Sequence, residues 1–360
     1  MASPRALQIL AGPAALRHLR ERGLKPADVR VVPAAAGGPK GLTLIALDRY
    51  IFGHWLSGST QTLHLLGASI GAWRMACACL PDADAALAEL AQDYITQTYP
   101  HEPGKLPTAA GISRVFGERL QQRLGVRAAE VLAHPQRRLH VFTSRGRHLL
   151  HRAGPARAAA GYLGAYLANA LSRRALGGWL ERVVFSDPRD ALPVPLHDFR
   201  SARVTLDERN LAPSVLASCA IPFALEPVQD PPGAPRGTYW DGGITDYHLH
   251  LDYAAMPEGL VLYPHFHNRV VPGWLDKAWS RRHRSTAFLD NLVLLAPRPE
   301  WVATLPNGKL PDRADFKAYG DDIAGRQRDW RRALAESQRL ADEFAQVVHA
   351  GRPFEALALS

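Results

Sequence analysis

A strand, a glycine-rich turn and a helix follow one another twice near the start of the chain, and this pattern constrains the fold more than any other feature. Residues 29–33 form a short apolar run that leads into the turn Ala-Gly-Gly-Pro-Lys-Gly at 36–41, after which apolar residues recur at helical spacing. Residues 62–66 form a second apolar run, followed by Gly-Ala-Ser-Ile-Gly at 67–71 and an alanine-rich segment. Strands that alternate with helices predict an α/β fold, in which helices cover both faces of a mostly parallel sheet.

The rest of the chain continues this pattern. We expect helices over 87–99, 112–124 and 330–348, and strands over 139–143, 183–186, 238–240, 259–263 and 292–295. A polar loop separates the first two of these helices and contains Pro100, Pro103, Gly104 and Pro107. The last helix is amphipathic, so we expect it to pack on the sheet.

These elements predict a single domain over residues 1–360. Its motif core spans about 29–245, and the C-terminal strands and helix, at 259–350, pack on that core. The middle region, 82–182, contains no catalytic motif. We expect it to cap the site and to set its specificity.

The composition indicates an ordinary globular protein. Of the 360 residues, 47% are hydrophobic and 21% are charged, and no apolar run approaches the ~20 residues that a membrane-spanning helix needs. The N-terminus lacks the continuous apolar segment of a secretory signal, so we expect a cytoplasmic protein. The chain has three cysteines and no Cys-x-x-Cys pair, so we expect neither a disulfide framework nor a thiolate metal site.

The net charge of +9 suits either nucleic acid or an anionic membrane as a partner. The arginines are scattered, and no helix-turn-helix, zinc-finger or aromatic RNA-binding signature is present, so we expect no nucleic-acid partner. The segment 272–284 combines Trp274 and Trp279 with a basic cluster, which is typical of peripheral contact with an anionic membrane. The alternative is a solvated surface helix with one tryptophan packed inward. The sequence does not define an oligomeric state.

Ser69 is the candidate nucleophile. It lies in Gly67-x-Ser69-x-Gly71, between an expected strand and an expected helix, which is the context of a nucleophile elbow. A sharp turn there lifts the hydroxyl clear of the backbone, and the flanking glycines allow strand, helix and substrate to approach closely. The alternative is a structural turn in which Ser69 only caps the helix.

The first glycine-rich turn is the candidate oxyanion-binding loop. Consecutive backbone N–H groups at the start of a helix bind anions, and in an acyl hydrolase that anion is the tetrahedral oxyanion. Gly37 and Gly38 are the best donors, and Lys40 has a further N–H group. A phosphate cradle is the alternative, but the full P-loop spacing is missing.

Asp241 is the candidate general base. It begins Asp241-Gly242-Gly243 directly after the expected strand 238–240, so we expect its carboxylate at a strand end. An ordinary Asp-Gly turn is the alternative. A free aspartate, with a pKa of about 3.9, is a weak base for an alcohol, but burial would raise that pKa.

The glycine-rich turn, Gly-x-Ser-x-Gly and Asp-Gly-Gly, in this order and each at a strand end, resemble the patatin-like phospholipase family. The segment Ala-Ser-Cys-Ala-Ile-Pro-Phe at 217–223 is similar to the family's alanine-serine segment with a following proline, which lines the core near the site. The resemblance covers about residues 29–245. It implies a three-layer α/β/α domain that hydrolyses lipid acyl esters without calcium, a metal site or another cofactor.

The resemblance also implies roles for particular residues. Ser69 and Asp241 would form a catalytic dyad that acts through an acyl-enzyme on phospholipid, lysophospholipid or related carboxylic esters. The implied oxyanion donors are Gly37, Gly38, Lys40 and Ile70, and the implied supporting glycines are Gly41, Gly67, Gly71, Gly242 and Gly243.

Two positions depart from the family's pattern. Ala36 stands where the family often has another glycine, and residues 244–251 lack the usual Asn-x-Pro. A divergent subfamily with an altered pocket wall is one explanation. The other is a non-catalytic lipid-binding or regulatory protein that keeps the fold.

Two His-x-His pairs follow Asp241, namely His248 with His250 and His265 with His267. They leave a Ser-His-Asp carboxylesterase or thioesterase as a further function, although the elbow comes early in the chain for an α/β-hydrolase. They also leave a metal site, if extended backbone puts each pair on one face. Partly exposed histidines that hydrogen-bond at sheet ends are the simpler interpretation, and we expect no metal.

Overall fold

The computed structural model describes residues 4–101, 107–350 and 355–360, so Pro103 and Gly104 of the expected polar loop lie outside the described residues. Its strands are β1 (Leu7–Ala11), β2 (Val29–Ala34), β3 (Leu63–Ala68), β4 (Arg137–Gly146), β5 (Leu180–Ser186), β6 (Ser201–Thr205), β7 (Val228–Gln229), β8 (Thr238–Trp240), β9 (Leu260–Pro264), β10 (Leu292–Pro297) and β11 (Leu357–Ala358). Its α-helices are α1 (Pro13–Arg22), α2 (Ile45–Tyr50), α3 (Ile70–Ala78), α4 (Ala83–Thr96), α5 (Ala109–Arg123), α6 (Ala128–Ala133), α7 (Pro155–Leu171), α8 (Arg173–Leu176), α9 (Leu211–Ser218), α10 (Gly243–Asp246), α11 (Pro299–Val302), α12 (Ala314–Tyr319), α13 (Ile323–Glu336) and α14 (Gln338–His349).

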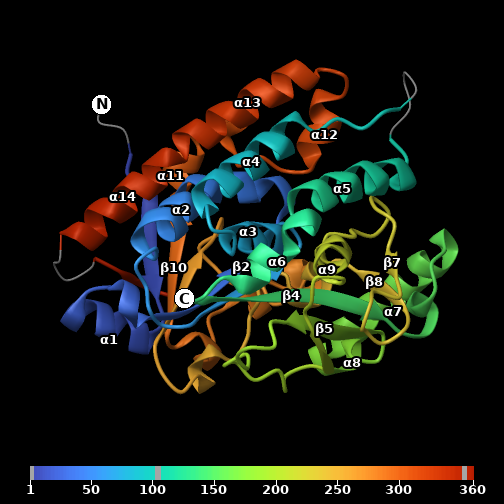
Figure 1. Cartoon of the computed structure of the whole chain (residues 1–360), viewed down its shortest axis with the longest axis horizontal. Coiled ribbons are helices and arrows are strands. Elements are labelled where there is room, and N and C mark those ends of the chain that lie inside the picture. The colour runs from blue at the N-terminus through green and yellow to red at the C-terminus, as the bar shows by residue number, and fades with distance from the viewer. Residues whose placement is uncertain (1–3, 102–106, 351–354) are drawn as a thin grey trace.

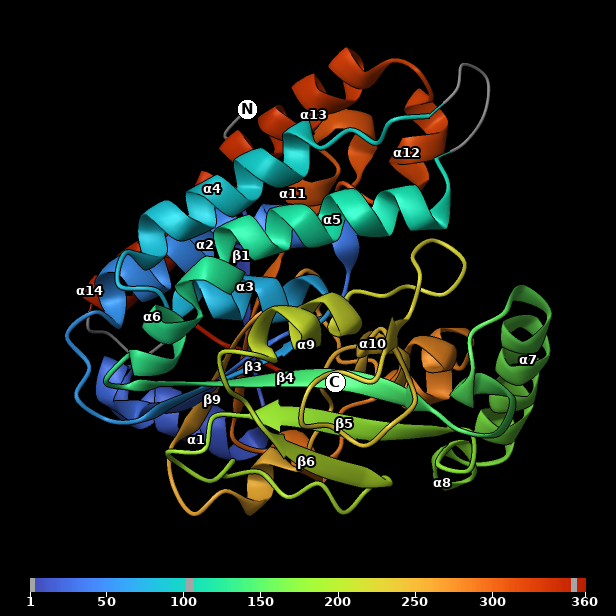
Figure 2. The ribbon, with the colours of Figure 1, turned by 45° about the vertical axis from the view of Figure 1, so that its right-hand side comes forward.

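One sheet runs through the molecule (Figure 1). Its strand order is β11-β1-β10-β9-β2-β3-β4-β5-β6. The neighbouring strands from β10 to β4 are parallel, and β5 pairs antiparallel with β4. Strands β3, β9 and β10 are buried along their whole length, because helices and loops cover both faces. Helices α2 to α5 lie on one side of the sheet and α1 on the other (Figure 2). The expected three-layer α/β/α fold with a mostly parallel sheet is confirmed.

The two strand-turn-helix units form as the glycine spacing predicts. Strand β2 leads into the 3-10 helix η2 (Gly38–Leu44) and α2, and β3 leads directly into α3. All residues of α3 are buried, so this helix lies in the core behind the sheet. The unit β3-α3 therefore holds the elbow between two layers of the fold.

The C-terminal region joins this sheet. Strands β9 and β10 lie between β1 and β2, so strands from the two ends of the chain are neighbours in one sheet.

The expected helix over 330–348 is wrong in one respect, because two helices, α13 and α14, meet at Ser337. The hydroxyl of Ser337 donates to the carbonyl oxygen of Leu334, a local bond that competes with the regular helix ladder. Phe344 of α14 packs on Tyr50 and Trp55, so this helix covers α2 more than the sheet face.

Candidate active site

The backbone at Ser69 has the strained geometry of a nucleophile elbow. Its φ is 55° and its ψ is −129°, in the turn between β3 and α3. A Cβ atom at Gly71 would lie 2.0 Å from the carbonyl oxygen of Ala34, and one at Gly67 would lie 2.3 Å from Cα of Ala72. Glycine is therefore required on both sides of Ser69, because strand and helix touch there.

The side chains of Ser69 and Asp241 meet directly. The hydroxyl of Ser69 donates to Oδ2 of Asp241 over 2.7 Å, and the two residues are only 3% and 5% exposed. The N–H of Gly243 donates to the other carboxylate oxygen, Oδ1, over 2.7 Å. Both oxygens of Asp241 are thus held in place. In the part of the chain that the structure describes, no histidine hydrogen-bonds to either side chain of this pair.

Burial raises the pKa of Asp241 above its ordinary value. The positive charge of Arg313 and the hydrogen bonds from Ser69 and Gly243 oppose this rise without cancelling it. A carboxylate with a raised pKa is a stronger base, so this environment favours removal of the proton from Ser69.

Helix α9 ends beside the elbow. The backbone N–H of Ser69 donates to Oγ of Ser218, and the N–H of Gly242 donates to the carbonyl oxygen of Ser218. The expectation that segment 217–223 lines the core near the site agrees with this placement. The neighbouring thiol of Cys219 is buried, which raises its pKa well above its usual range, so it stays protonated and is a poor nucleophile.

The two glycines after Asp241 allow close packing. A Cβ atom at Gly242 would lie 2.0 Å from the carbonyl oxygen of Phe142, and one at Gly243 would lie 2.5 Å from Cβ of Ala36. The methyl group of Ala36 thus occupies the space beside Gly243. The N–H of Ala36 donates to the carbonyl oxygen of Tyr247, so it is engaged within the fold.

The segment without Asn-x-Pro forms the short helix α10 and is anchored in another way. Asp246 forms a fully buried ion pair with Arg182, with N···O distances of 2.5 and 2.8 Å. The hydroxyl groups of Thr245 and Ser144 lie 2.9 Å apart, and Ser144 also donates to the carbonyl oxygen of Asp241. These contacts tie α10 to β4 and β5, so the segment is ordered despite the missing motif.

The first glycine-rich turn lies against the elbow. Gly38 has φ +56° and opens η2, whose first N–H groups have no partner within the helix. A Cβ atom at Gly37 would lie 2.5 Å from the ring of Phe266, and one at Gly41 would lie 3.2 Å from the side chain of Ile70. Ile70 is the first residue of α3. The fold therefore brings the first glycine-rich turn into contact with the start of α3.

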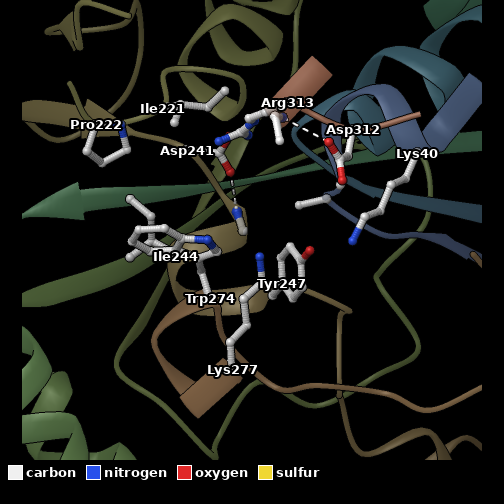
Figure 3. Close-up of a pocket in the computed structure, with 14 residues that line it drawn as sticks. Lys40, Ile221, Pro222, Asp241, Ile244, Tyr247, Trp274, Lys277, Asp312 and Arg313 are labelled. Carbon is white, nitrogen blue, oxygen red and sulfur yellow. Dashed lines mark hydrogen bonds between the residues drawn. The ribbon is translucent and has the colours of Figure 1, made fainter. Parts of the chain in front are cut away.

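A pocket of about 340 Å³ opens over this arrangement (Figure 3). Its lining residues come from the two turns, the Asp-Gly-Gly segment and the C-terminal region, and they are Ala36, Gly37, Lys40, Ile221, Pro222, Asp241, Gly243, Ile244, Tyr247, Trp274, Lys277, Asp312, Arg313 and Ala314. Ser69 is not among these lining residues, but its hydroxyl bonds to Asp241, which is.

Three cations, Lys40, Lys277 and Arg313, reach into this pocket from different directions (Figure 3). None of them forms an ion pair with a carboxylate among the described residues. The only other acid of the lining, Asp312, is already paired with Lys309 at 2.9 Å. The pocket therefore carries uncompensated positive charge.

The pKa values of the two lysines reflect this crowding. Partial burial, with the charges of Lys40 and Arg313, lowers the pKa of Lys277 to about 8. Burial also lowers the pKa of Lys40, and Arg313 adds to the effect. An anion in the pocket would relieve this repulsion.

The histidine pairs are buried, so the interpretation of partly exposed histidines is wrong for His248, His250 and His265, which are 0%, 8% and 0% exposed. His248 accepts from the N–H of Val271, and His265 bonds within its own turn to His267. The described residues contain no group of three or more His, Cys, Asp or Glu side chains that could hold a metal ion. The rings of His248 and His265 pack on Phe266, whose own ring lies against Gly37 of the glycine-rich turn.

The segment 272–284 is not one surface helix. It forms two 3-10 helices, η7 (Trp274–Ala278) and η8 (Ser280–His283). Trp274 and Lys277 line the pocket, while the ring of Trp279 stacks on Tyr166 of α7 at 6.2 Å. Trp279 therefore packs against another helix, whereas Trp274, which is 41% exposed, faces the pocket.

Sequence reasoning missed Arg313 and the pocket roles of Trp274 and Lys277. Arg313 lies between a turn and the short helix α12, more than seventy residues after Asp241, and no motif marks it. The cluster of cations around Trp274 was visible as a composition, but only the fold shows that part of it faces the pocket.

The chain is similar to one known family and to two solved structures. A family model described as patatin-like phospholipase matches residues 35–249. Among solved structures, the chain is similar to VipD from Legionella pneumophila, with 12% identity and a TM-score of 0.40 over 98% of this chain and 71% of that chain. It is also similar to human GIVD cytosolic phospholipase A2, with 11% identity and a TM-score of 0.38 over 94% of this chain and 65% of that chain. No curated protein sequence matches the chain.

Proposed function

The chain belongs to the patatin-like phospholipase family, and on this premise we propose that it hydrolyses acyl esters of phosphate-bearing lipids, with Ser69 as nucleophile and Asp241 as base. One observation carries the proposal, namely the direct 2.7 Å hydrogen bond from the Ser69 hydroxyl to the Asp241 carboxylate. Both residues are buried, Asp241 lines the pocket, and burial strengthens it as a base.

The proposed reaction has two steps. Oγ of Ser69 attacks the ester carbonyl carbon while its proton passes to Oδ2 of Asp241, and the N–H groups of Gly37 and Gly38 bind the oxyanion that forms. The bond to the leaving alcohol then breaks, the alcohol takes the proton from Asp241, and an acyl-enzyme remains. Water then gives a proton to Asp241 and attacks this ester, Asp241 returns the proton to Oγ of Ser69 as the acyl bond breaks, and the fatty acid leaves. The N–H of Ile70 is a further donor to the oxyanion, because Ile70 directly follows the nucleophile.

The charge of the pocket supports a phosphate-bearing substrate. Lys40, Lys277 and Arg313 have no carboxylate partner among the described residues, and an anionic head group would supply one. A neutral glyceride would leave these cations unpaired. We therefore place the head group near these three side chains.

We also propose that residues 1–360 act as one domain. Strands β9 and β10, outside the matched range 35–249, lie between strands of the same sheet, and Lys277 and Arg313 of the C-terminal region complete the pocket. The matched range alone would lack one wall of the site.

The test is hydrolysis of a short-chain p-nitrophenyl ester and of lysophospholipid by the purified chain, beside Ser69→Ala and Asp241→Asn. Ser214→Ala is the matched control, because Ser214 is also a buried serine and its hydroxyl donates to the carbonyl oxygen of Leu211 in its own helix. A fluorophosphonate label reports the nucleophile independently of turnover. We expect both site variants to lose activity by at least about 10³-fold and the label to require Ser69.

Two alternatives give different results in this assay. A Ser-His-Asp enzyme would lose activity in His248→Ala or His250→Ala as fully as in Ser69→Ala. The buried pairing of His248 with Val271 and of His250 with Thr286 disfavours it. A non-catalytic lipid-binding protein would show neither turnover nor labelling with any ester.

A further inference from the structure

Helix α7 exposes a stripe of leucines. Leu163, Leu167 and Leu171 are 61%, 57% and 85% exposed, and their spacing of four residues puts them on one side of the helix. The other exposed positions of the helix are Pro155, Ala156, Arg157, Ala159 and Ala160, and Arg157 is the only charged residue in the helix. A surface helix normally turns polar residues to water. This outer face is therefore unusually apolar for a helix on a protein surface.

The opposite side of α7 anchors the helix firmly. Tyr162 packs on Trp240 with ring centroids 5.6 Å apart, and Asn169 donates to the buried carboxylate of Asp276 over 2.8 Å. Figure 2 shows α7 at the edge of the molecule, beyond the end of β4. The leucines are thus presented on a fixed helix, and no described residue covers them.

Exposed arginines lie in α7 and in the segments that flank it. Between Glu130 and Glu181 the chain has eight arginines and no acidic residue. Arg152, Arg157 and Arg174 are exposed, and none of them forms an ion pair within the described part of the chain. Free cations beside an apolar stripe are the composition of a helix that lies in a membrane interface.

The segment with η7 and η8 adds to the same surface. Trp279 stacks on Tyr166 of α7, the guanidinium of Arg282 donates to the carbonyl oxygen of Asn169, and Arg281 lies exposed over the Trp279 ring at 5.6 Å. An amphipathic tryptophan next to a free arginine is typical of the boundary between lipid head groups and acyl chains.

This surface adjoins the pocket. Tyr162 contacts the ring of Phe223, which is 65% exposed and directly follows the pocket residue Pro222. Trp240, on the other side of Tyr162, directly precedes Asp241. A lipid at the outer face of α7 would therefore lie close to the entrance of the pocket.

We propose that Leu163, Leu167 and Leu171 of α7, with Trp279 and the exposed Arg157, Arg174 and Arg281, form a docking face that binds the surface of an anionic lipid bilayer. This inference rests on the proposed lipid hydrolysis for its purpose, but the binding itself is separate from catalysis. The leucines enter the boundary of the acyl chains, the arginines contact anionic head groups, and the pocket opens beside the site of contact.

The positive charge beside the leucine stripe favours an anionic bilayer, rather than a second copy of the chain, as the partner of this surface. A symmetric pair joined through α7 would bring equal surfaces together, and the free arginines of both copies would then meet without acidic partners. An anionic bilayer supplies the missing negative charge. No helix in the described part of the chain is long and apolar enough to cross a membrane.

Flotation of the full chain with vesicles tests the docking face. The vesicles are phosphatidylcholine alone, or phosphatidylcholine mixed with phosphatidylglycerol, and hydrolysis of the soluble p-nitrophenyl ester is measured on the same samples. The main variant is Leu163→Gln/Leu167→Gln/Leu171→Gln, in which glutamine keeps the helix propensity. Its matched control is Val126→Gln/Leu357→Gln, which replaces exposed apolar side chains, 72% and 55% exposed, elsewhere on the molecule.

A second variant tests the charge. Arg157→Gln/Arg174→Gln is compared with Arg17→Gln/Arg20→Gln, which removes two exposed arginines of α1 at the other end of the molecule (Figure 1). We expect wild-type protein to float with the mixed vesicles. Binding should fall at least about tenfold in the leucine variant, and about fivefold for each arginine removed from the docking face. Both control variants and the hydrolysis of the soluble ester should remain as in wild type.

Three outcomes would overturn the docking face. The first is wild-type protein that does not float with mixed vesicles, and the second is a leucine variant that floats as well as wild type. The third is a wild-type dimer in sedimentation that the leucine variant dissociates, which would assign the stripe to a second copy. Flotation without any ester hydrolysis would leave the docking face intact and overturn only the proposed function.

Discussion

Oγ of Ser218 accepts a 2.8 Å hydrogen bond from the backbone N–H of Ser69 and donates a 2.6 Å bond to the carbonyl oxygen of Phe142. One hydroxyl thus links helix α9, the elbow and strand β4. Because the elbow has a strained backbone, this link holds Ser69 in the conformation that points its side chain at Asp241.

Ser218→Ala should lower both stability and activity. It leaves two buried backbone groups without a partner, which costs about 1–3 kcal/mol of unfolding free energy. It also loosens the nucleophile, so kcat should fall about ten- to a hundredfold with little change in KM. Ser214→Ala, one turn earlier in α9, should lose stability but keep kcat. Equal kcat in the two variants would show that Ser218 is only structural. Urea unfolding and steady-state kinetics give both quantities.

Asp241→Asn should abolish activity and yet raise the melting temperature near neutral pH. Burial raises the pKa of Asp241 in the folded state, so the folded protein binds the proton more tightly than the unfolded chain. The buried carboxylate therefore destabilises the fold once the pH rises above the unfolded value of about 3.9, and fully so above the raised folded pKa. The gain in melting temperature from Asp241→Asn should shrink as the pH falls towards the unfolded-state pKa of about 3.9. Thermal unfolding of both proteins across this pH range checks the sign, and a variant that is less stable at pH 8 would refute it.

Arg313→Gln should shift the acid limb of the pH-rate profile to higher pH. The charge of Arg313 lowers the pKa of Asp241, so its removal raises that pKa further and leaves less of the base ionised at a given pH. Lys317→Gln removes an exposed cation from the adjacent helix α12 and should leave the limb in place. The measurement is kcat/KM of the soluble ester against pH. An unchanged limb in Arg313→Gln would mean that its charge does not reach the base.

Lys277 should make substrate binding sensitive to alkaline pH. Its pKa of about 8 means that it loses its charge on going from pH 7 to pH 9, so KM for an anionic lysophospholipid should rise over this range. Lys277→Arg should hold KM constant there, because arginine stays protonated. A neutral ester gives the control, since its KM should not follow the charge of Lys277. A wild-type KM for the anionic substrate that is flat from pH 7 to pH 9 would contradict the head-group assignment.

Gly243→Ala should be rescued in part by Ala36→Gly. The added methyl would lie 2.5 Å from Cβ of Ala36 and 3.0 Å from Oδ1 of Asp241, a degree of overpacking that costs about 1–3 kcal/mol. Removing the methyl of Ala36 relieves the first contact and leaves the second. The double variant should therefore recover stability more than activity, measured by unfolding and by turnover. If the stability lost in the double variant equals the sum of the losses in the two single variants, these positions do not interact.

Sequence reasoning reached the parts of the site that depend on local backbone geometry. The elbow at Ser69 and the turn after Asp241 need glycine, because another segment of the same chain lies within about 2 Å of where a Cβ atom would be. The spacing of glycines in the motifs shows this requirement. The two strand-turn-helix units were predictable for the same reason. Their apolar runs are buried on both faces, so each reads as a continuous hydrophobic strand.

Contacts between distant segments could not be predicted in this way. Arg313 reaches the pocket only because α12 packs at its rim, and a single arginine in a loop has no periodic pattern. The helix α7 was missed because alanine and glycine dominate it, so its amphipathic signal is weak. The burial of His248 and His265 depends on the turns after α10 and β9 facing each other, which no local rule indicates.

The position of β9 and β10 between β1 and β2 affects the order in which the sheet can form during synthesis. A growing chain can pair β2, β3 and β4 early, but one edge of β2 stays open until residue 264 has left the ribosome. An open edge of a hydrophobic parallel strand is a site for aggregation, and pairing across more than two hundred residues is slow. The elbow can thus form well before the sheet that supports it is closed. Protection of the nascent chain during this interval would then determine the yield of active protein.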